Sequence, residues 1–208
     1  MKPTISLCMI VKDEEKLLEG CLKPIKELID EIIIIDTGSI DKTKEIANKL
    51  TNKVYNFEWC DDFSEARNFS IEKATKEWIL ILDADEILTK EDLIKIKEII
   101  KNNNKDTLGY RIIQETYYKN KIVSIRGICR IFKNNKQIKF QYPIHETVRN
   151  SIKEKNKKIG KTGIVIKHFP RLDRDKTEYY LKLLKTKKEY FPESNVDKEI
   201  ENEKKLKF

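Results

Sequence analysis

The 208-residue sequence contains no long apolar run. No segment approaches about 18 consecutive apolar residues, so no transmembrane helix is expected. The N-terminus lacks the layout of a signal peptide, because Lys2 is followed by a short strand-like run and then by Asp13-Glu14-Glu15. The four cysteines form no Cys-x-x-Cys motif, which argues against a zinc ribbon. Scattered cysteines are typical of a reducing compartment, so a cytoplasmic location is predicted.

Positive charge is in excess but not gathered into one obvious patch. Lysine and arginine number 43 against 35 acidic residues, which gives a net charge of +8. Because the basic residues are not interleaved with aromatic ones, we expect no nucleic-acid partner. Much of the charge lies in residues 101–105, 133–139 and 153–161, which are typical of solvated loops. A second interpretation is a mild attraction for anionic substrates, phosphates or a membrane surface, including a peripheral membrane contact.

The first 104 residues alternate between two patterns. Strand-like apolar runs cover 5–11, 31–35, 54–57 and 78–82, and helical spacing covers 14–29, 41–50, 62–75 and 90–100. Pro24 interrupts the first helical pattern and predicts a kink. This alternation predicts an α/β fold with a doubly wound parallel sheet. After residue 104 the pattern predicts mostly antiparallel strands over 107–118, 122–132 and 137–140, a further strand over 163–168 and a helix over 173–190.

The most informative segment is 79–85, where an apolar run of strand length ends in Asp83-Ala84-Asp85. A run that is apolar on both faces predicts a central strand, and ligands bind at the C-terminal edge of such sheets. Asp36 ends the second predicted strand at the same edge. Neighbouring carboxylates repel each other unless a cation lies between them, and a divalent cation is the usual partner. The alternative is that Asp85 caps the helix that begins near residue 90.

Four segments, in this order, resemble the inverting family 2 glycosyltransferases, which have a GT-A nucleotide-sugar fold. They are Ile5 to Glu15, Asp30 to Thr43, Asp62 to Asn68 and Leu82 to Glu86. The resemblance extends well over residues 4–150, and the nearest subgroup is that of the sublancin-type bacterial peptide S-glycosyltransferases. It implies a mostly parallel Rossmann-like sheet with flanking helices and a smaller antiparallel acceptor-side region. Residues 1–170 would form this domain, divided into a nucleotide-sugar half (1–104) and an acceptor half (105–170), and 171–208 would be a C-terminal helical extension.

The resemblance also implies a set of residues that bind the nucleotide-sugar. Asp36 would contact the uracil or the ribose, or would instead cap the next turn. Glu14 would lie on the nucleotide side, or would be a first-turn helix acid. Arg67 would face the diphosphate, since its planar fork matches phosphate oxygens, or would pair with Glu65 on a helix surface. The full implied set is Val11, Glu14, Asp36, Arg67, Asp83 and Ala84.

The resemblance also implies a set of metal ligands and a catalytic base. Asp85 would bind Mn²⁺ or Mg²⁺ directly, and Asp83 would lean toward the ribose and the metal. His168 would be a third ligand, or a satisfied histidine at a strand end. Inverting transfer needs a base on the acceptor side. Glu146 is the first candidate and His145 the second, because both follow an antiparallel segment where the family places its acceptor-side residues. This chain lacks the Glu-Asp pair of many relatives.

The leading hypothesis is a metal-dependent enzyme that transfers a hexose or N-acetylhexosamine from a UDP-sugar, with inversion, to a protein, peptide or cell-envelope saccharide. A nucleotidyltransferase is the first alternative, but it should carry a Gly-rich basic loop where this chain has Lys12-Asp13-Glu14-Glu15. A GT-A module without catalysis is the second, and the presence of Asp36, Arg67, Asp83 and Asp85 argues against it. The particular sugar, the acceptor and the oligomeric state are left open.

Overall fold

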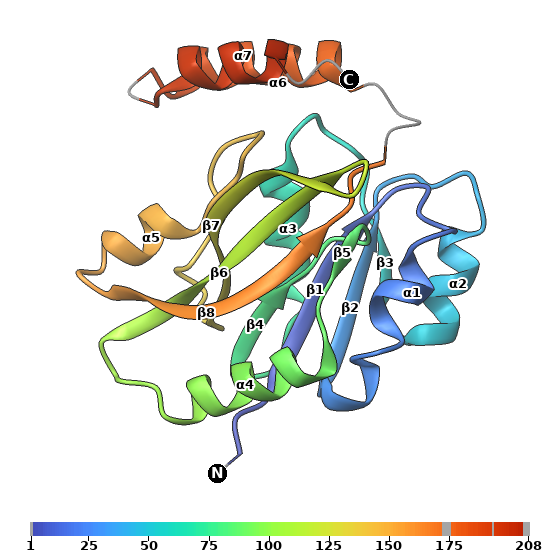
Figure 1. Cartoon of the computed structure of the whole chain (residues 1–208), viewed down its shortest axis with the longest axis vertical. Coiled ribbons are helices and arrows are strands. Elements are labelled where there is room, and N and C mark those ends of the chain that lie inside the picture. Colours follow the sequence, from blue (N-terminus) through green and yellow to red (C-terminus); the bar gives the residue numbers. More distant parts are fainter. Residues whose placement is uncertain (1, 172–175, 193, 206–208) are drawn as a thin grey trace.

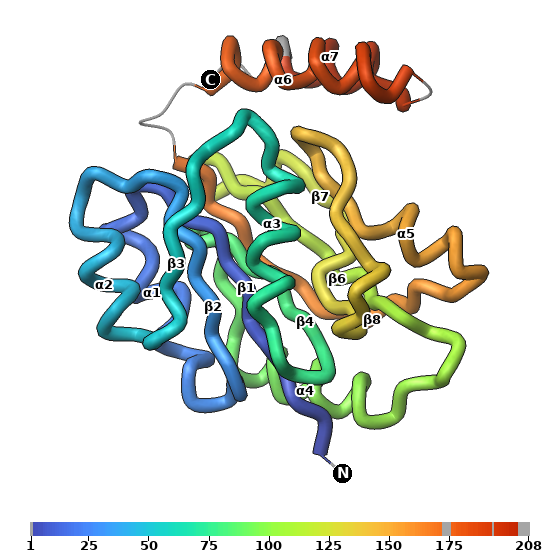
Figure 2. Tube along the Cα trace, turned by 180° about the vertical axis from the view of Figure 1, so that it is seen from behind, coloured from blue at the N-terminus to red at the C-terminus, as the bar shows by residue number. Residues whose placement is uncertain are grey.

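The computed structural model describes residues 2–171, 176–192 and 194–205, except for the side chains of 204 and 205. Within these residues it has a mixed sheet in the order β3-β2-β1-β4-β7-β6-β8-β5, with helices on both faces (Figures 1 and 2). The predicted α/β class with a GT-A-type arrangement is confirmed. No helix of the described chain is long and apolar enough to cross a membrane.

The N-terminal half supplies the parallel part of the sheet. Its strands are β1 (Ile5–Val11), β2 (Glu31–Asp36), β3 (Val54–Asn56) and β4 (Trp78–Ile81). They alternate with α1 (Leu18–Leu22), the 3₁₀ turn η1 (Lys26–Leu28), α2 (Thr43–Leu50), α3 (Phe63–Glu72) and, after β4, α4 (Lys90–Lys101). Strand β1 lies between β2 and β4, and all three run in parallel. Their C-terminal ends therefore meet at one edge, as the sequence predicts.

The C-terminal half extends the same sheet. It contains β5 (Glu86–Ile87), β6 (Thr107–Tyr118), β7 (Lys121–Lys133), α5 (Arg149–Lys153), β8 (Lys158–His168), α6 (Thr177–Tyr190) and α7 (Val196–Lys205). Strand β7 is antiparallel to both β4 and β6, whereas β8 is parallel to β6. The short strand β5 pairs with the end of β8 in the register Glu86↔His168. This pairing brings the end of β8 beside the Asp83-Ala84-Asp85 segment.

The predicted helix over residues 14–29 is wrong in its extent. Only residues 18–22 are α-helical, and a short 3₁₀ turn covers 26–28. The backbone N–H groups of Asp13 and Glu14 donate to the side chains of Ser39 and Thr43, at 2.9 and 2.6 Å. These bonds tie the turn before α1 to the loop after β2 and to the start of α2. The α-helix ends at Leu22 because Pro24 has no N–H with which to continue it.

The strand predicted at 137–140 is also absent from the structure. Side chains replace the partner strand, because Asn68 accepts from the backbone N of Phe140 (2.8 Å) and donates to its backbone O (3.1 Å). The Ser151 hydroxyl contacts Lys139 in the same way. The capping role considered for Asp85 is wrong, since Thr89 is the N-cap of α4 and accepts from the backbone N of Asp92.

Helices α6 and α7 lie side by side over one end of the sheet (Figure 1). Leu183, Leu184 and Val196 are buried together with Ile144 of the loop before α5, and Phe63 of α3 packs against this cluster. Helix α6 falls within the range predicted from the sequence, although the predicted start at Asp173 lies outside the described residues. The helix pair therefore holds the segment that precedes α5.

Two apolar cores cover the two faces of the sheet. One contains buried side chains of α1, α2 and α4, and the other contains those of α5 together with Phe69 and Ile71 of α3. Residues 32–35 of β2 contribute alternately to both cores, which explains why the strand is apolar throughout. The polar exceptions along this strand, Glu31 at its start and Asp36 at its end, therefore need specific partners.

Glu31 provides a test of the energetics of the fold. Burial raises its pKa, but hydrogen bonds from Lys53, Ser6 and Thr75 outweigh burial and lower the pKa to about 2. A shift of this size corresponds to about 3 kcal/mol, of which we expect about 2 kcal/mol because Lys53 is partly solvated. We therefore expect Glu31→Gln to lower the free energy of unfolding by about 2 kcal/mol at pH 7.

The pH dependence has a definite sign. A lowered folded-state pKa gives stability that is present above the ordinary value of 4.5 and is lost as the pH falls toward 2. The difference between the wild type and Glu31→Gln in urea unfolding should therefore shrink over this range. Glu45→Gln, which removes an exposed pair with Lys49, is the control and should change little. A difference that stays constant down to pH 2 would contradict the assignment.

Candidate active site

Two of the residues predicted to bind the nucleotide-sugar, Val11 and Asp36, lie at the C-terminal ends of β1 and β2. Val11 and Asp36 are register partners, and both are buried. The carbonyl O of Val11 accepts from the backbone N and the hydroxyl of Thr37, at 3.0 and 3.1 Å. The Asp36 carboxylate accepts from the backbone N of Ser39 at 3.2 Å, so the turn-capping contact considered from the sequence is present. The turn holds the carboxylate at the edge of the sheet.

Glu14 lies at the same edge. It is not in a first helical turn, because α1 begins only at Leu18. Its carboxylate is 3.7 Å from the guanidinium of Arg171, which follows β8. The same guanidinium donates to the backbone O of Asp13. The chain beyond β8 thus closes over the end of β1.

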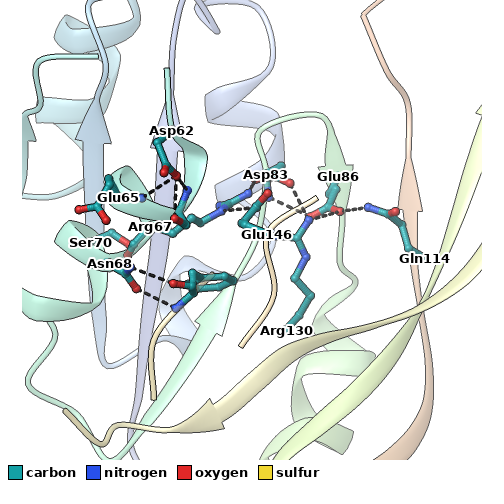
Figure 3. A network of polar contacts seen from close by, with 12 residues as sticks. Asp62, Glu65, Arg67, Asn68, Ser70, Asp83, Glu86, Gln114, Arg130 and Glu146 are labelled. Atoms are coloured by element: carbon teal, nitrogen blue, oxygen red, sulfur yellow. Dashed lines mark hydrogen bonds and ion pairs between the residues drawn. The ribbon is translucent and has the colours of Figure 1, made fainter. Parts of the chain in front are cut away.

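Arg67 and Arg130 lie on either side of Asp83 (Figure 3). Nη2 of Arg67 is 2.6 Å from Oδ1 of Asp83, and Nη2 of Arg130 is 2.6 Å from Oδ2. Arg67 also donates from Nε to Glu146 at 3.0 Å, and Arg130 reaches Glu86 at 3.2 Å. Arg67 is only 4% exposed, so its alternative interpretation as a surface helix residue is wrong. Charges of opposite sign thus alternate across the site from Glu146 to Glu86.

The network has clear electrostatic consequences. Burial raises the pKa of Asp83, but the charges of Arg130 and Arg67 outweigh burial and hold its pKa well below the usual range. Burial raises the pKa of Glu86, and Arg130 offsets only part of that effect. Two neighbouring carboxylates therefore have pKa values that move in opposite directions. Nη1 of Arg67 is buried without a hydrogen-bond partner in the described chain, so a buried donor is available in the site.

The loop that carries Glu146 is held on α3. Asn68 supports this loop through its two hydrogen bonds to Phe140. The backbones of Gln141 and Thr147 exchange two hydrogen bonds of 3.1 Å, which close the loop. Tyr142 and His145 have positive φ, at 83° and 53°, a strained conformation that often marks functional loops. The side chain of Glu146 points into the network beside Arg67 (Figure 3).

His145 lies in a different environment from its neighbour. Its Nδ1 is 3.1 Å from Oε2 of Glu199 in α7. That carboxylate also accepts from Lys187 of α6 at 2.8 Å. The side chain of His145 is 38% exposed and links the loop to the C-terminal helix pair. Of the two candidates for the base, the structure brings Glu146 alone into contact with Arg67.

Asp85 and His168 meet across the β5–β8 pairing. Nε2 of His168 is 3.3 Å from Oδ2 of Asp85, and Nδ1 faces the hydroxyl of Thr116 at 3.1 Å. Two ligands of one octahedral cation lie about 3 Å apart, so this pair fits a shared divalent cation. Burial lowers the pKa of His168, but the hydrogen bond to Asp85 and the charges of Glu86 and Asp83 outweigh burial, and the net shift is upward. The same negative surroundings would attract a metal ion.

The described residues contain no cluster of three or more acidic, histidine or cysteine side chains that could hold a metal alone. Both carboxylate oxygens of Asp83 face guanidinium groups, so the structure brings together Asp85 and His168 from the implied metal set. Ala84 is buried between the two aspartates. A cation in this position would need further ligands, and Mg²⁺ and Mn²⁺ commonly take them from water and from substrate phosphates.

Four residues of the network, Arg130, Glu86, Gln114 and Arg126, were not predicted from the sequence to belong to the site. Arg130 and Glu86 ion-pair, and the Glu86 carboxylate also accepts from Nε2 of Gln114, whose Oε1 accepts from Arg126 at 2.6 Å. Glu86 is fully buried. The signal that could have found Arg130 is its place in an otherwise apolar stretch, Ile128 to Phe132, which predicts a buried cation that needs carboxylate partners.

Arg67 offers a stability test of this network. Removing a buried partner leaves the opposing charges uncompensated, which costs about 3–5 kcal/mol. We therefore expect Arg67→Ala to lower the free energy of unfolding by about 3 kcal/mol or more, because Asp83 and Glu146 both lose a contact. Urea unfolding measures this, and Lys44→Ala on the exposed face of α2 is the control. Equal stability of the two variants would contradict the network.

The chain belongs to family 2 of the glycosyl transferases, because the model of that family, Glycosyl transferase family 2, matches residues 6–178. Glycosyltransferase SunS of Bacillus phage SPbeta is 34% identical over 153 residues, which are 71% of this chain and 35% of SunS. The TPR repeat-containing protein Synpcc7942_0270 of Synechococcus elongatus is 40% identical over 148 residues, 71% of this chain and 36% of that protein. This chain spans about a third of the length of these relatives.

Solved structures show the same fold. Residues 1–349 of S. aureus TarS in complex with UDP match with a TM-score of 0.63 and 16% identity, over 87% of this chain and 63% of that one. The mannosyltransferase PcManGT from Pyrobaculum calidifontis, in complex with GDP-Man and Mn²⁺, matches with a TM-score of 0.65 and 12% identity, over 88% and 61%. At these identities the likeness concerns the fold.

Proposed function

We propose that the chain is the catalytic domain of a metal-dependent inverting glycosyltransferase that takes its sugar from a UDP-sugar. The observation that carries this proposal is the meeting of Glu146, Arg67, Asp83 and Arg130 beside the Asp85–His168 pair. If this edge of the sheet had only a structural role, a row of alternating charges that are largely removed from water would not be expected, because such networks seldom add net stability. TarS was crystallised with UDP and with UDP-GlcNAc, which supports UDP as the nucleotide.

Asp85 and His168 would hold the divalent cation, Mn²⁺ or Mg²⁺. When bound, the cation supplies Lewis-acid stabilisation of the negative charge on the leaving nucleoside diphosphate. Thr116 orients the ring of His168 through Nδ1, which leaves Nε2 toward Asp85. A nitrogen ligand is less suited to Mg²⁺, which prefers oxygen, so the pair favours Mn²⁺. PcManGT contains Mn²⁺ in its complex with GDP-Man, which supports this choice.

The other residues would bind and orient the reactants. Val11, Glu14 and Asp36 would form the nucleotide edge, with Ala84 and Asp83 at the ribose side. The unpartnered Nη1 of Arg67 would donate to a diphosphate oxygen. Glu146 would accept the proton of the acceptor nucleophile at its carboxylate, and Arg67 would hold that carboxylate in place through Nε. His145, linked to Glu199, would position the loop.

We propose a protein, peptide or cell-envelope saccharide as the acceptor, a proposal supported by the similarity to SunS and extended from the resemblance of the sequence. We also propose a cytoplasmic location, because none of the four cysteines forms a disulfide. A non-catalytic module is the competing interpretation, and the contact between Arg67 of α3 and the largely covered carboxylate of Glu146 in the acceptor loop argues against it.

Donor turnover tests the proposal. The protein with Mn²⁺ is incubated with UDP-glucose, UDP-galactose or UDP-GlcNAc, and UDP release is followed together with the proton NMR spectrum of the first sugar released. The expected result is UDP release with one donor, and a β-anomer from the α-linked donor. An α-anomer formed first would overturn inversion. Intact UDP binding with no UDP release from any donor would favour a binding module.

A further inference from the structure

A small cavity on the acceptor half is surrounded by positive charge. Its volume is about 160 Å³, and it is lined by Arg111 of β6, Arg149 and Lys153 of α5, and Lys157 and Ile159 near the start of β8. Lys161 is the register partner of Arg111 across the parallel β6–β8 pair, so the two side chains lie on one face of the sheet. Four lining side chains and one neighbour are therefore cationic, and none of the lining residues is acidic.

The sequence around the cavity holds much of the excess charge of the chain. Among residues 149–161, six are lysine or arginine and one is glutamate, which is a net charge of +5 where the whole chain has +8. The sequence pattern alone is typical of a solvated loop. In the structure, however, this stretch folds back as α5 and the start of β8 and surrounds the cavity.

Most of these cations have no counter-charge. Lys157 pairs with Asp106 at 2.9 Å, whereas Arg111, Arg149 and Lys153 make no ion pair with any residue that the structure describes. Like charges that converge repel each other, and an anion between them removes that repulsion. Among the lining residues, three cations are therefore available to a ligand.

The arginines converge at β7. A Cβ atom on Gly127 would lie 3.8 Å from Cδ of Arg111, so the arginine stem lies across that strand. Burial raises the pKa of the Cys129 thiol to about 12, and Arg111, Arg130 and Arg149 oppose this effect. The charges of both cavity arginines, Arg111 and Arg149, thus reach the same side chain of β7, Cys129. The next residue along β7 is Arg130, which contacts Asp83 in the active site.

We propose that this cavity binds phosphate groups of an anionic acceptor chain. The volume is below the roughly 300–1,000 Å³ of pockets that enclose whole small molecules, so it suits a single charged group. Arginine forks match phosphate oxygens, and several converging cations favour the higher charge of phosphate over a carboxylate. Arg149 follows Glu146 by three residues, and all the lining residues belong to the half of the chain that is expected to face the acceptor, residues 105–170. The role as an acceptor site rests on the proposed glycosyltransferase function, whereas phosphate binding does not.

Calorimetry with a short inorganic polyphosphate in metal-free buffer tests the proposal. The double variant Arg111→Ala with Arg149→Ala is expected to bind at least about tenfold more weakly, since it removes the two side chains that can make paired charge-assisted hydrogen bonds to phosphate oxygens. Lys44→Ala with Lys90→Ala removes the same charge from exposed positions at α2 and α4, and should weaken binding less than about twofold. Arg111→Lys with Arg149→Lys keeps the charge and should retain part of the affinity.

Equal weakening in the two alanine double variants, or no polyphosphate binding by the wild type, would overturn the phosphate site. Poly-glutamate is the second probe, and binding as tight as that of polyphosphate would replace phosphate by a carboxylate chain. Melting temperatures show whether each variant is folded. UDP affinity with Mn²⁺ should be the same in every variant, so failure of this proposal is distinguishable from failure of the proposed donor site.

Discussion

Replacement of Asp85 by alanine is expected to abolish sugar transfer while the free energy of unfolding changes by less than about 1 kcal/mol. Asp85 packs no apolar core and contacts His168 through one ion pair, so its loss removes a metal ligand and little packing. Without that carboxylate the leaving nucleotide loses its Lewis-acid stabilisation. The measurement is UDP release from the active UDP-sugar, together with urea unfolding of the same preparation.

Glu45→Ala is the matched control, since it also removes one carboxylate from an ion pair, with Lys49, on the exposed face of α2. It should retain full turnover. Asp85→Asn keeps the shape of the side chain without its charge and should behave like Asp85→Ala. Full activity in either Asp85 variant would remove this residue from the metal site.

Glu146→Gln is expected to lower kcat by about 10³-fold with UDP affinity almost unchanged, because a positioned base contributes about 10²–10⁴-fold. Glutamine keeps the size of the side chain and can still face Arg67, but it cannot take the proton of the acceptor. A group that acts only on the acceptor should affect kcat and leave donor binding intact. Steady-state kinetics with the identified acceptor and calorimetry with UDP measure the two effects.

Glu154→Gln, an exposed glutamate just after α5, is the control and should leave kcat unchanged. Unchanged kcat in Glu146→Gln would move the base elsewhere. In that case His145→Asn should lose activity, and Glu199→Gln should alter its pH profile because Glu199 contacts the imidazole. Loss of activity in Glu146→Gln alone would leave His145 as a residue that positions the loop.

The parallel half of the fold could be predicted from local pattern. Buried strands such as β2 and β4 are apolar along their whole length, and their carboxylate ends, Asp36 and Asp83, fall at the edge where parallel strands meet. These features depend on residues close together in the sequence. The expected helix over 14–29 is shorter than predicted, since Pro24 has no N–H with which to extend α1 beyond Lys23. The turn before α1 is instead held by the side chains of Ser39 and Thr43, about 26–29 residues away in the sequence.

The Arg130–Asp83 contact could not be predicted in the same way. It depends on β7 crossing beside β4, and 47 residues separate its two partners. The Asp85–His168 pair likewise depends on the strand β5, which has only two residues and is too short for a periodic pattern to predict. His168 could be proposed from the family resemblance, but only the sheet topology brings it to Asp85. The sequence thus predicts that carboxylates end the strands at this edge. The residues that contact those carboxylates can be assigned only once the order and register of the strands are known.

The measurement that tests this account most directly is calorimetry of UDP binding to the purified chain, with and without Mn²⁺, for the wild type and Asp85→Ala. The account predicts that Mn²⁺ strengthens UDP binding at least about tenfold in the wild type, and that Asp85→Ala loses this gain but retains the weaker metal-free binding. UDP binding that is absent under both conditions, or that is equally strong with and without Mn²⁺ in both proteins, would contradict a metal-dependent donor site at Asp85 and His168.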